Sequence, residues 1–280
     1  MKILVTGAEG MLARAVTKYC SGIGDDVYSP TKKDLDITSA ELVEETVRDG
    51  GFHAIINCAA FTDVDGSESQ PDKCFEVNAL GPRNLAVAAA ANDVKLITIS
   101  TDYVFDGLLS EPYDELSTPN PQGVYGKSKL EGERLVAAAA PSATIVRSGW
   151  IYGYHGKNFL SMVRSLLEGG KRIVAITDCF GTPTFADDLA VRLRELCSSP
   201  LSGVIHLSNT GSNVSYATFA EKICEIQGYS DGLLEYATSA VLNRPAPRPA
   251  QSALCSIRIE ESGITPMPDW QNALERFLAE

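Results

Sequence analysis

An apolar run followed by a glycine turn opens the chain and limits the folds that it can adopt. Residues 3–5 are Ile, Leu and Val, and Gly7 and Gly10 follow within a few positions. A continuous apolar run is typical of a strand buried on both faces of a parallel sheet. A helix is expected directly afterwards, from Met11 to about Cys20. The glycines therefore lie in a strand-to-helix turn at one edge of a predicted sheet.

This turn predicts a dinucleotide-binding site. Gly7 permits a tight turn, and Gly10 permits a pyrophosphate to approach the helix N-terminus, where free N–H groups and the helix dipole favour an anion. Ala13 stands where the usual pattern has its third glycine and is small enough for close packing. A plain strand-to-helix connection is the alternative. The cofactor-binding residues expected here are Gly7, Glu9, Gly10, Met11 and Leu12.

Strand and helix patterns alternate along the first half of the chain. Further strands are expected at residues 26–29, 54–57, 96–100 and 144–146. The helices expected before the fourth strand are 38–49, which a capping box of Thr38 and Glu41 opens, and 71–91, which a Gly-Pro pair at 81–82 interrupts. This alternation predicts an α/β fold with a Rossmann-like, doubly wound parallel sheet over residues 1–150. Ligands of such sheets bind at the carboxyl ends of the strands.

Residues 151–280 are expected to form a smaller α/β lobe that binds substrate, with later segments returning to the first domain. Its predicted helices are 158–168, 187–197 and 216–227, and its predicted strands are 172–176 and 204–207. The Pro-rich stretch 243–252 is expected to be an ordered loop, because proline does not fit a helix interior. Arg244 and Arg248 in this loop suit phosphate recognition, with solvated arginines as the alternative.

The second strand determines which cofactor is expected. No Asp or Glu at its end is placed to bind both ribose hydroxyls of NAD, and Lys32 and Lys33 follow instead. These lysines either accept a 2′-phosphate or are simply solvated. NADPH is therefore the predicted cofactor, with NADH also accepted. After the third strand, the small residues Cys58, Ala59 and Ala60 allow a cofactor to lie against the backbone.

A Tyr and a Lys four residues apart form the candidate acid–base pair. Tyr125 and Lys129 lie in an uninterrupted helical segment, so they share a helix face. A nearby cation favours the phenolate and would lower the phenol pKa from about 10, making the tyrosine an acid or base near neutrality. Tyr28 and Lys32 have the same spacing, but Pro30 separates them, and so spacing alone proves little. Thr101, at the carboxyl end of the fourth strand, either binds a reacting carbonyl or satisfies its local turn.

Composition excludes several other classes of protein. A formal net charge of −12 argues against nucleic acid and anionic membranes as partners. The apolar start is too short for a signal peptide or a membrane span, which favours a cytoplasmic protein. The seven cysteines are scattered and never in C-x-x-C spacing, and the three histidines are equally dispersed. Reduced thiols and no metal site are expected.

Several stretches together resemble the extended short-chain dehydrogenase/reductase family, and within it most closely the dTDP-4-dehydrorhamnose reductases. The resemblance spans nearly the whole chain. The blocks that carry it are residues 7–12, 57–65, 100–107, 124–133, 147–153, 181–184 and 248–252. Blocks 57–65 and 100–107 point to this branch in particular, whereas the Tyr-Lys block is shared by the whole superfamily.

The resemblance implies a role for individual residues. Thr101, Tyr125 and Lys129 would form the catalytic triad. Thr62, Val64, Tyr103 and Trp150 would lie near the sugar, Arg248 would face the nucleotide diphosphate, and Asp36 and Ile37 would lie beside the adenine. The implied reaction is hydride transfer to C4 of a dTDP-linked 4-keto-6-deoxy sugar, with Tyr125 giving the oxygen a proton. The implied protein is a monomer or homodimer.

Two other functions remain compatible with the same residues. The family also resembles the regulatory beta subunit of methionine adenosyltransferase, which binds the cofactor as a partner protein without acting on rhamnose precursors. Reduction of a different nucleotide-linked keto sugar is the other possibility. The sequence departs from the family pattern at Gly149, before Trp150, where many relatives have Ser. This departure would loosen the sugar pocket without affecting hydride transfer.

Overall fold

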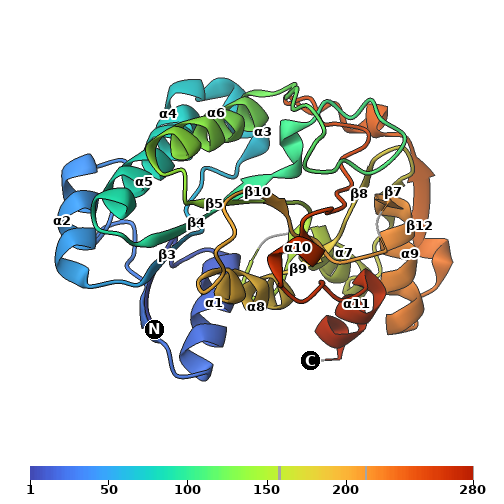
Figure 1. Cartoon of the computed structure of the whole chain (residues 1–280). Helices are drawn as coiled ribbons and strands as arrows, with labels where there is room; N and C mark the ends of the chain where they lie inside the picture. Colours follow the sequence, from blue (N-terminus) through green and yellow to red (C-terminus); the bar gives the residue numbers. More distant parts are fainter. Residues whose placement is uncertain (157–158, 212, 280) are drawn as a thin grey trace.

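A six-stranded, fully parallel sheet forms the centre of the computed structural model, which describes residues 1–156, 159–211 and 213–279 (Figure 1). The strand order is β10-β5-β4-β3-β1-β2. Adjacent pairs are all parallel. The strands are β1 (Lys2–Thr6), β2 (Asp26–Tyr28), β3 (Ala54–Asn57), β4 (Lys95–Thr101), β5 (Thr144–Ser148) and β10 (Gly203–His206). This architecture confirms the predicted doubly wound α/β fold.

Helices cover both faces of this sheet, which explains the continuous apolar runs of its strands. Helices α1 (Met11–Gly22) and α8 (Ala186–Leu196) pack together on one face. On the other face, α5 (Gly81–Ala91) packs between α2 (Ala40–Gly50) and α6 (Val124–Ala139). Every residue of β3 and β5 is buried as a result. A strand buried on both sides needs no polar alternation, and none is found here.

The start of α2 differs from its prediction. Ser39, not Thr38, caps α2, and its hydroxyl accepts a bond from the Leu42 N–H at 3.4 Å. Thr38 is unavailable because its hydroxyl donates to Asp36 Oδ1 at 2.9 Å, so the capping box predicted with Glu41 does not form.

The helical stretch 71–91 is continuous through Gly81 and Pro82, contrary to the predicted interruption. It comprises α4 (Pro71–Phe75), a π-helical turn (Glu76–Leu80) and α5. The irregularity thus lies in the turn before Pro82, which is itself in the first turn of α5, where its missing N–H is tolerated. Gly81 is required by packing, since a Cβ there would lie 2.6 Å from Ile37 Cδ1. A short helix that was not predicted, α3 (Val64–Ser69), precedes this stretch.

The second half of the chain contributes both to the main sheet and to a separate smaller core. Strand β10 pairs with β5 and completes the main sheet. The smaller core contains α7 (Phe159–Glu168), α9 (Tyr216–Gln227) and α11 (Trp270–Leu278), with β7 (Ile173–Ile176) paired to β12 (Leu234–Ala237). Two-residue strands pair nearby: β6 (Ile151–Tyr152) with β9 (Thr184–Phe185), and β8 (Phe180–Gly181) with β11 (Val214–Ser215).

Short elements complete the chain. They are α10 (Ile259–Ser262) and three 3₁₀ turns at Asp102–Val104, Asp231–Leu233 and Ser239–Leu242. The helices predicted at 187–197 and 216–227 and the strands predicted at 172–176 and 204–207 are present within one residue or so. Asn158, the predicted start of α7, lies outside the described residues. The Pro-rich stretch 243–252 is an ordered loop, as predicted, joined to β8 by a bridge between Phe180 and Gln251.

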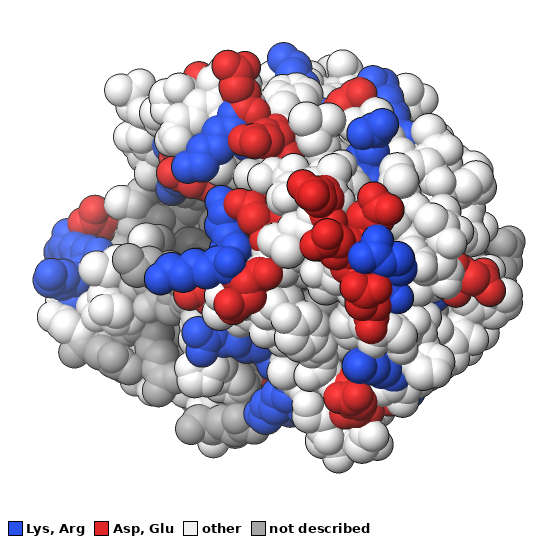
Figure 2. All heavy atoms as spheres, turned by 90° about the vertical axis from the view of Figure 1, so that its left-hand side faces the viewer, with Lys and Arg blue, Asp and Glu red and all other residues white. Residues whose placement is uncertain are grey.

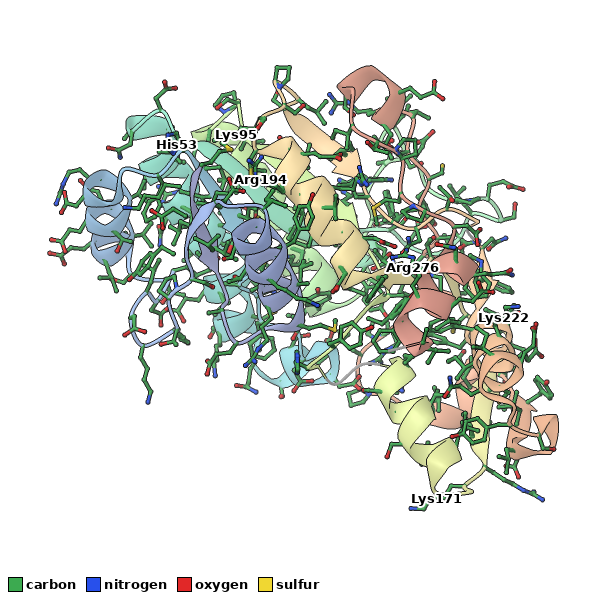
Figure 3. All side chains as sticks on the ribbon, turned by 90° about the horizontal axis from the view of Figure 1, so that it is seen from below. His53, Lys95, Lys171, Arg194, Lys222 and Arg276 are labelled. Atoms are coloured by element: carbon green, nitrogen blue, oxygen red, sulfur yellow. The ribbon has the colours of Figure 1, made fainter. Side chains whose placement is uncertain are left out.

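Two ion pairs fasten α8 to distant segments (Figure 3). Arg194 near the end of α8 binds Asp25, just before β2, with Nη2 3.1 Å from Oδ1. Arg276 on α11 donates to Asp188 at the start of α8 over 2.7 Å. Through α8, these pairs link the C-terminal helix α11 to the first βαβ unit.

Charges of both signs are mixed on the side of the molecule that carries α2. Figure 2 shows basic side chains with acidic neighbours over this face. Helix α2 itself contributes the pair Arg48 and Asp49, with Nε 3.0 Å from Oδ1. Over the described residues, no helix combines the length and the apolar character needed to cross a bilayer.

Candidate active site

The glycine turn after β1 is shaped by contact with the end of β3. Gly7 has φ +78°, and a Cβ at this position would lie 2.8 Å from the Ala59 backbone nitrogen. Both the backbone conformation and the close approach therefore require glycine. The structure thus brings together the two segments that were predicted separately to hold the cofactor, the turn and the small residues Cys58, Ala59 and Ala60.

The turn ends at the N-terminus of α1. Gly10 N–H donates to Gly7 O at 2.8 Å, and Gly10 precedes the helix in an extended conformation without a side-chain cap. The first-turn N–H groups of α1, which have no intrahelical acceptors, lie at the carboxyl edge of the sheet. Glu9 is exposed, whereas the Leu12 side chain belongs to the core. Leu12 therefore offers only its backbone to a ligand.

Residues after β2 form an exposed basic loop with one internal ion pair. Lys32 and Lys33 are both exposed, and Lys32 Nζ lies 3.5 Å from Asp36 Oδ2. Burial alone would raise the pKa of Asp36, but hydrogen bonds from Thr38 and the charge of Lys32 lower it overall. The Ile37 side chain is buried in the core. Of the two residues expected beside the adenine, only Asp36 has a side chain near the surface.

A buried Asn links three neighbouring strands of the sheet through side-chain hydrogen bonds. Asn57 Oδ1 accepts the Thr6 hydroxyl of β1 at 2.6 Å, and Asn57 Nδ2 donates to the Thr98 hydroxyl of β4 at 2.9 Å. These bonds run across β1, β3 and β4 just below the turn. They link the last residues of β1 and β3 to the middle of β4.

Helix α6 begins against the end of β4, which places Tyr125 beside Thr101. Its N-cap is Gly123, so the cap is supplied by Glu68 of α3, which accepts the Val124 N–H at 2.8 Å. A Cβ at Gly126 would lie 2.2 Å from Tyr103 O, so glycine permits this close packing. Tyr125 then lies with its ring 6.0 Å from that of Tyr103, edge to face.

The Tyr125 phenol is protonated at neutral pH. Burial raises its pKa well above the ordinary value of 10, and a hydrogen bond with the Thr101 hydroxyl lowers it only partly. We predicted that Lys129 would lower this pKa; in the structure burial outweighs any such effect. A protonated phenol suits a group that gives a proton to its substrate.

Lys129 is buried one helical turn after Tyr125. Its ammonium donates to Ile99 O of β4 at 2.6 Å. Burial lowers the pKa of Lys129 to about 8, although the carboxylate of Glu133 opposes the shift. Cys58 lies close enough for its thiol pKa to be influenced by Lys129, although burial dominates the rise in that pKa to about 12. The ammonium therefore lies between α6 and β4, close to Cys58.

A buried ion pair that was not predicted lies one further turn along α6. Glu133 and Arg147 form a bidentate pair, with Nε–Oε1 2.9 Å and Nη2–Oε2 2.7 Å, and both side chains are about 5% exposed. Ser100, next to Thr101, also donates to Glu133 Oε1. The pair therefore joins α6 to β4 and β5 directly beneath the candidate catalytic residues.

The residues expected near the sugar come from three segments: the start of α3, the turn after β4 and the chain just after β5. Trp150 has φ +45° and its ring stacks on that of Tyr216 of α9, with centroids 3.7 Å apart. A Cβ at Gly181 would lie 2.3 Å from the Trp150 ring, so glycine makes room for it. Val64 begins α3 and is half-buried, and Thr62 is exposed just before it.

Arg248 is held by a carboxylate of α3. Its guanidinium forms a bidentate pair with Asp65, with Nη1–Oδ1 2.9 Å and Nη2–Oδ2 3.1 Å. Arg244 Nη1 lies 3.8 Å from the same carboxylate. Hydrogen bonding to Arg248 is the main reason that the pKa of Asp65 is lowered. Both arginines of the Pro-rich loop thus gather next to Val64.

Three further residues at the candidate site were not predicted. Tyr216 and Asp65 reach Trp150 and Arg248 through tertiary contacts, whereas Asp102 accepts a hydrogen bond from its sequence neighbour Thr101. The only available signal was position: Asp65 and Asp102 each follow a predicted site residue by one place. In the described part of the chain, no group of three or more His, Cys, Asp or Glu side chains is arranged to hold a metal ion.

Comparisons with known proteins identify the family of the chain. The profile of the RmlD substrate binding domain matches residues 1–280. The dTDP-4-dehydrorhamnose reductase of Mycobacterium tuberculosis is 40% identical over 284 residues, covering 99% of this chain and 92% of that protein.

Two crystal structures of dTDP-4-dehydrorhamnose reductases also match nearly the whole chain. The dTDP-4-dehydrorhamnose reductase of Bacillus anthracis, in complex with NADP, shares 36% identity and a TM-score of 0.95 over 99% of this chain and 98% of that one. The reductase of Clostridium acetobutylicum shares 36% identity and a TM-score of 0.94 over 100% of this chain and 99% of that one. These matches confirm the resemblance inferred from the sequence. The chain belongs to the dTDP-4-dehydrorhamnose reductase family.

Proposed function

We propose that this protein reduces the C4 keto group of a dTDP-linked 4-keto-6-deoxy sugar, converting dTDP-4-dehydrorhamnose to dTDP-L-rhamnose with NADPH. The observation that carries the proposal is the grouping of Thr101, Tyr125 and Lys129 at the carboxyl end of β4, with a protonated Tyr125 phenol. Relatives at 34–40% identity named for this reaction support the substrate class.

The cofactor cradle fits a dinucleotide. Gly7 and Gly10 leave the turn without side chains, and the small residues Cys58, Ala59 and Ala60 line the adjacent strand end. A cofactor bound there would supply the hydride. The first-turn N–H groups of α1, at Met11 and Leu12, would hold its pyrophosphate. Lys129, which donates to Ile99 O, would bind the nicotinamide ribose instead.

Side chains of the protein carry out the proton transfer to the substrate. Tyr125 donates its phenolic proton to the substrate oxygen, and Thr101 hydrogen-bonds the same oxygen as negative charge develops on it. Lys129 stabilises the phenolate that remains, since an ammonium in a buried site interacts strongly with a new anion.

The nucleotide sugar would lie between α3 and the smaller lobe. Thr62, Val64, Tyr103 and Trp150 surround the sugar. Arg248 exchanges its bidentate partner Asp65 for the diphosphate, which offers the same fork of oxygen acceptors.

A direct assay tests the proposal. Purified protein, NADPH and dTDP-4-dehydrorhamnose should consume reduced cofactor, and the product should be dTDP-L-rhamnose by chromatography. Activity with a different dTDP-4-keto sugar alone would move the assignment to another reductase. Binding of NADPH without turnover of any such sugar, together with co-purification of a methionine adenosyltransferase, would instead indicate a regulatory subunit.

Cofactor preference tests the basic loop after β2. We expect NADPH to be favoured over NADH by about tenfold in kcat/KM, because a charge-assisted contact is worth about 1.5–3 kcal/mol before solvent screening. Asp36 competes for Lys32 and both lysines are exposed, so the lower part of that range applies. The preference should fall as salt is raised.

Paired variants isolate the two lysines. Lys32→Ala/Lys33→Ala should bring the NADPH/NADH ratio close to one. Lys171→Ala/Lys222→Ala removes two charges from the smaller lobe (Figure 3) and should leave the ratio unchanged. A clear NADH preference of the parent protein at low salt would contradict a phosphate-binding role for Lys32 and Lys33.

A further inference from the structure

A carboxyl group that the proposed mechanism does not use lies directly beside Thr101. Asp102 is 3% exposed, and the Thr101 hydroxyl lies 3.0 Å from Asp102 Oδ1. The other oxygen, Oδ2, is buried without a hydrogen-bond partner. An unpartnered buried carboxylate oxygen is unusual, because desolvation of a charged group is expensive.

The segments around Asp102 offer no cation to its free oxygen. Gly149 faces it without a side chain, and a Cβ there would lie 2.6 Å from Oδ2. The Ser252 hydroxyl is nearby and favours the charged form, but it donates to Phe180 O at 3.3 Å. Among the described residues, Asp102 forms no ion pair, and the arginines Arg147, Arg244 and Arg248 pair with Glu133 and Asp65 instead.

The remaining titratable groups near Asp102 are phenols. They are Tyr103 on its own segment, Tyr125 on α6 and Tyr216 on α9, each of whose pKa values is raised mainly by burial and further by the Asp102 charge. Arg248 lies beyond, near Tyr103 and Tyr216, and is bound to Asp65. Burial raises the pKa of Asp102 to about 6, and the Thr101 hydrogen bond and the nearby Ser252 hydroxyl reverse only part of the shift.

The Thr101 hydroxyl can donate one hydrogen bond. Its oxygen already accepts the Tyr103 N–H at 3.2 Å. When Asp102 is ionised it can only accept, so Thr101 must direct its proton to Asp102. When Asp102 is protonated it can donate to Thr101, whose own proton is then free for another acceptor.

We propose that Asp102 is a positioning residue whose protonated form turns the Thr101 hydroxyl so that its proton points to the reacting oxygen. The inference rests on the proposed role of Thr101 in the reduction. No covalent step is involved, and Asp102 keeps its proton throughout. Gly149 contributes by leaving Oδ2 without a donor that would favour the charged form.

The pH profile of the parent enzyme tests this proposal. In kcat/KM, activity should fall by about tenfold per pH unit above about pH 6. It should level off after a loss of about 10²-fold, the usual contribution of one oxyanion donor. At that plateau the parent should turn over at the rate of Thr101→Val, because the Thr101 proton is no longer available.

Asp102→Asn gives the sharpest comparison. The amide N–H₂ donates permanently to Thr101, so this variant should be active and show no fall between pH 6 and 8. Asp93→Asn removes an exposed carboxylate elsewhere and should keep the parent profile. In a Thr101→Val background, Asp102→Asn should change the rate by less than twofold, since its effect acts through Thr101.

The outcomes separate the two proposals. A parent enzyme that never reduces the sugar contradicts the proposed function. A parent that reduces it with a flat profile between pH 6 and 8, or an Asp102→Asn variant that keeps the parent's fall, overturns the role of Asp102. If Asp102→Asn fails to fold, judged by thermal melting and NADPH binding, the parent profile and its agreement with Thr101→Val still decide the question.

Discussion

A Tyr125→Phe variant is expected to lose turnover by about 10²–10⁴-fold while keeping its fold and its affinity for NADPH. The substitution removes only the phenolic oxygen, so the aromatic ring that contacts Tyr103 edge to face remains. Burial keeps the parent phenol protonated, and so the variant lacks the proton that the parent donates. The loss should appear in kcat, with a small change in KM.

Tyr28→Phe is the matched control. Tyr28 and Lys32 have the same four-residue spacing as Tyr125 and Lys129, and the Tyr28 ring stacks on Phe52 with 6.0 Å between centroids. Phenylalanine preserves that stacking, so turnover should match the parent. Stopped-flow hydride transfer and equilibrium NADPH binding would measure both variants. Turnover of Tyr125→Phe within a factor of two of the parent would show that another group is the acid.

The two Tyr-Lys pairs also show what a sequence pattern can predict. Residues 124–139 contain no proline, so a shared helix face for Tyr125 and Lys129 followed from local chemistry. Tyr28 ends strand β2, and Pro30 precludes a common helix with Lys32. The main strands were equally predictable, because burial on both faces leaves a continuous apolar run.

Other parts of the fold carry no such local signal. Strands β6, β8, β9 and β11 have two residues each, which is too short for any periodicity. The π-helical turn before Pro82 was also missed, because Gly-Pro normally marks a break and only packing against Ile37 explains the glycine.

Candidate site residues could be proposed from the sequence, but their contacts could not. Arg248 was expected to face a diphosphate, and its partner Asp65 lies 183 residues away in sequence. Trp150 was expected near the sugar, but its stacking on Tyr216 depends on how the smaller lobe folds back. The direction of the Tyr125 pKa was also wrong, since burial is a property of the folded chain rather than of a helix.

The buried pair of Glu133 and Arg147 is the clearest case of a tertiary feature with a large energetic consequence. Besides the pair itself, Arg147 lies over the Phe105 ring at 5.1 Å, and Ser100 donates to Glu133. Two charges at this depth stabilise the protein only while both are present, because either alone would be left unsolvated. Their geometry also sets the position of α6 relative to β4, and thus of Tyr125 relative to Thr101.

We therefore expect Arg147→Met to lower the free energy of unfolding by about 3–5 kcal/mol, since it leaves the Glu133 carboxylate buried without its partner. Urea unfolding at pH 7.5, followed by circular dichroism, would measure the loss. The double variant Glu133→Leu/Arg147→Met removes both charges and should recover most of that stability. Arg134→Met, which removes an exposed arginine paired at 3.6 Å with Glu131, should cost less than about 1 kcal/mol. If the Arg147→Met loss were as small as that of Arg134→Met, water or another cation must reach Glu133, and the pair would not be what holds α6 against the sheet.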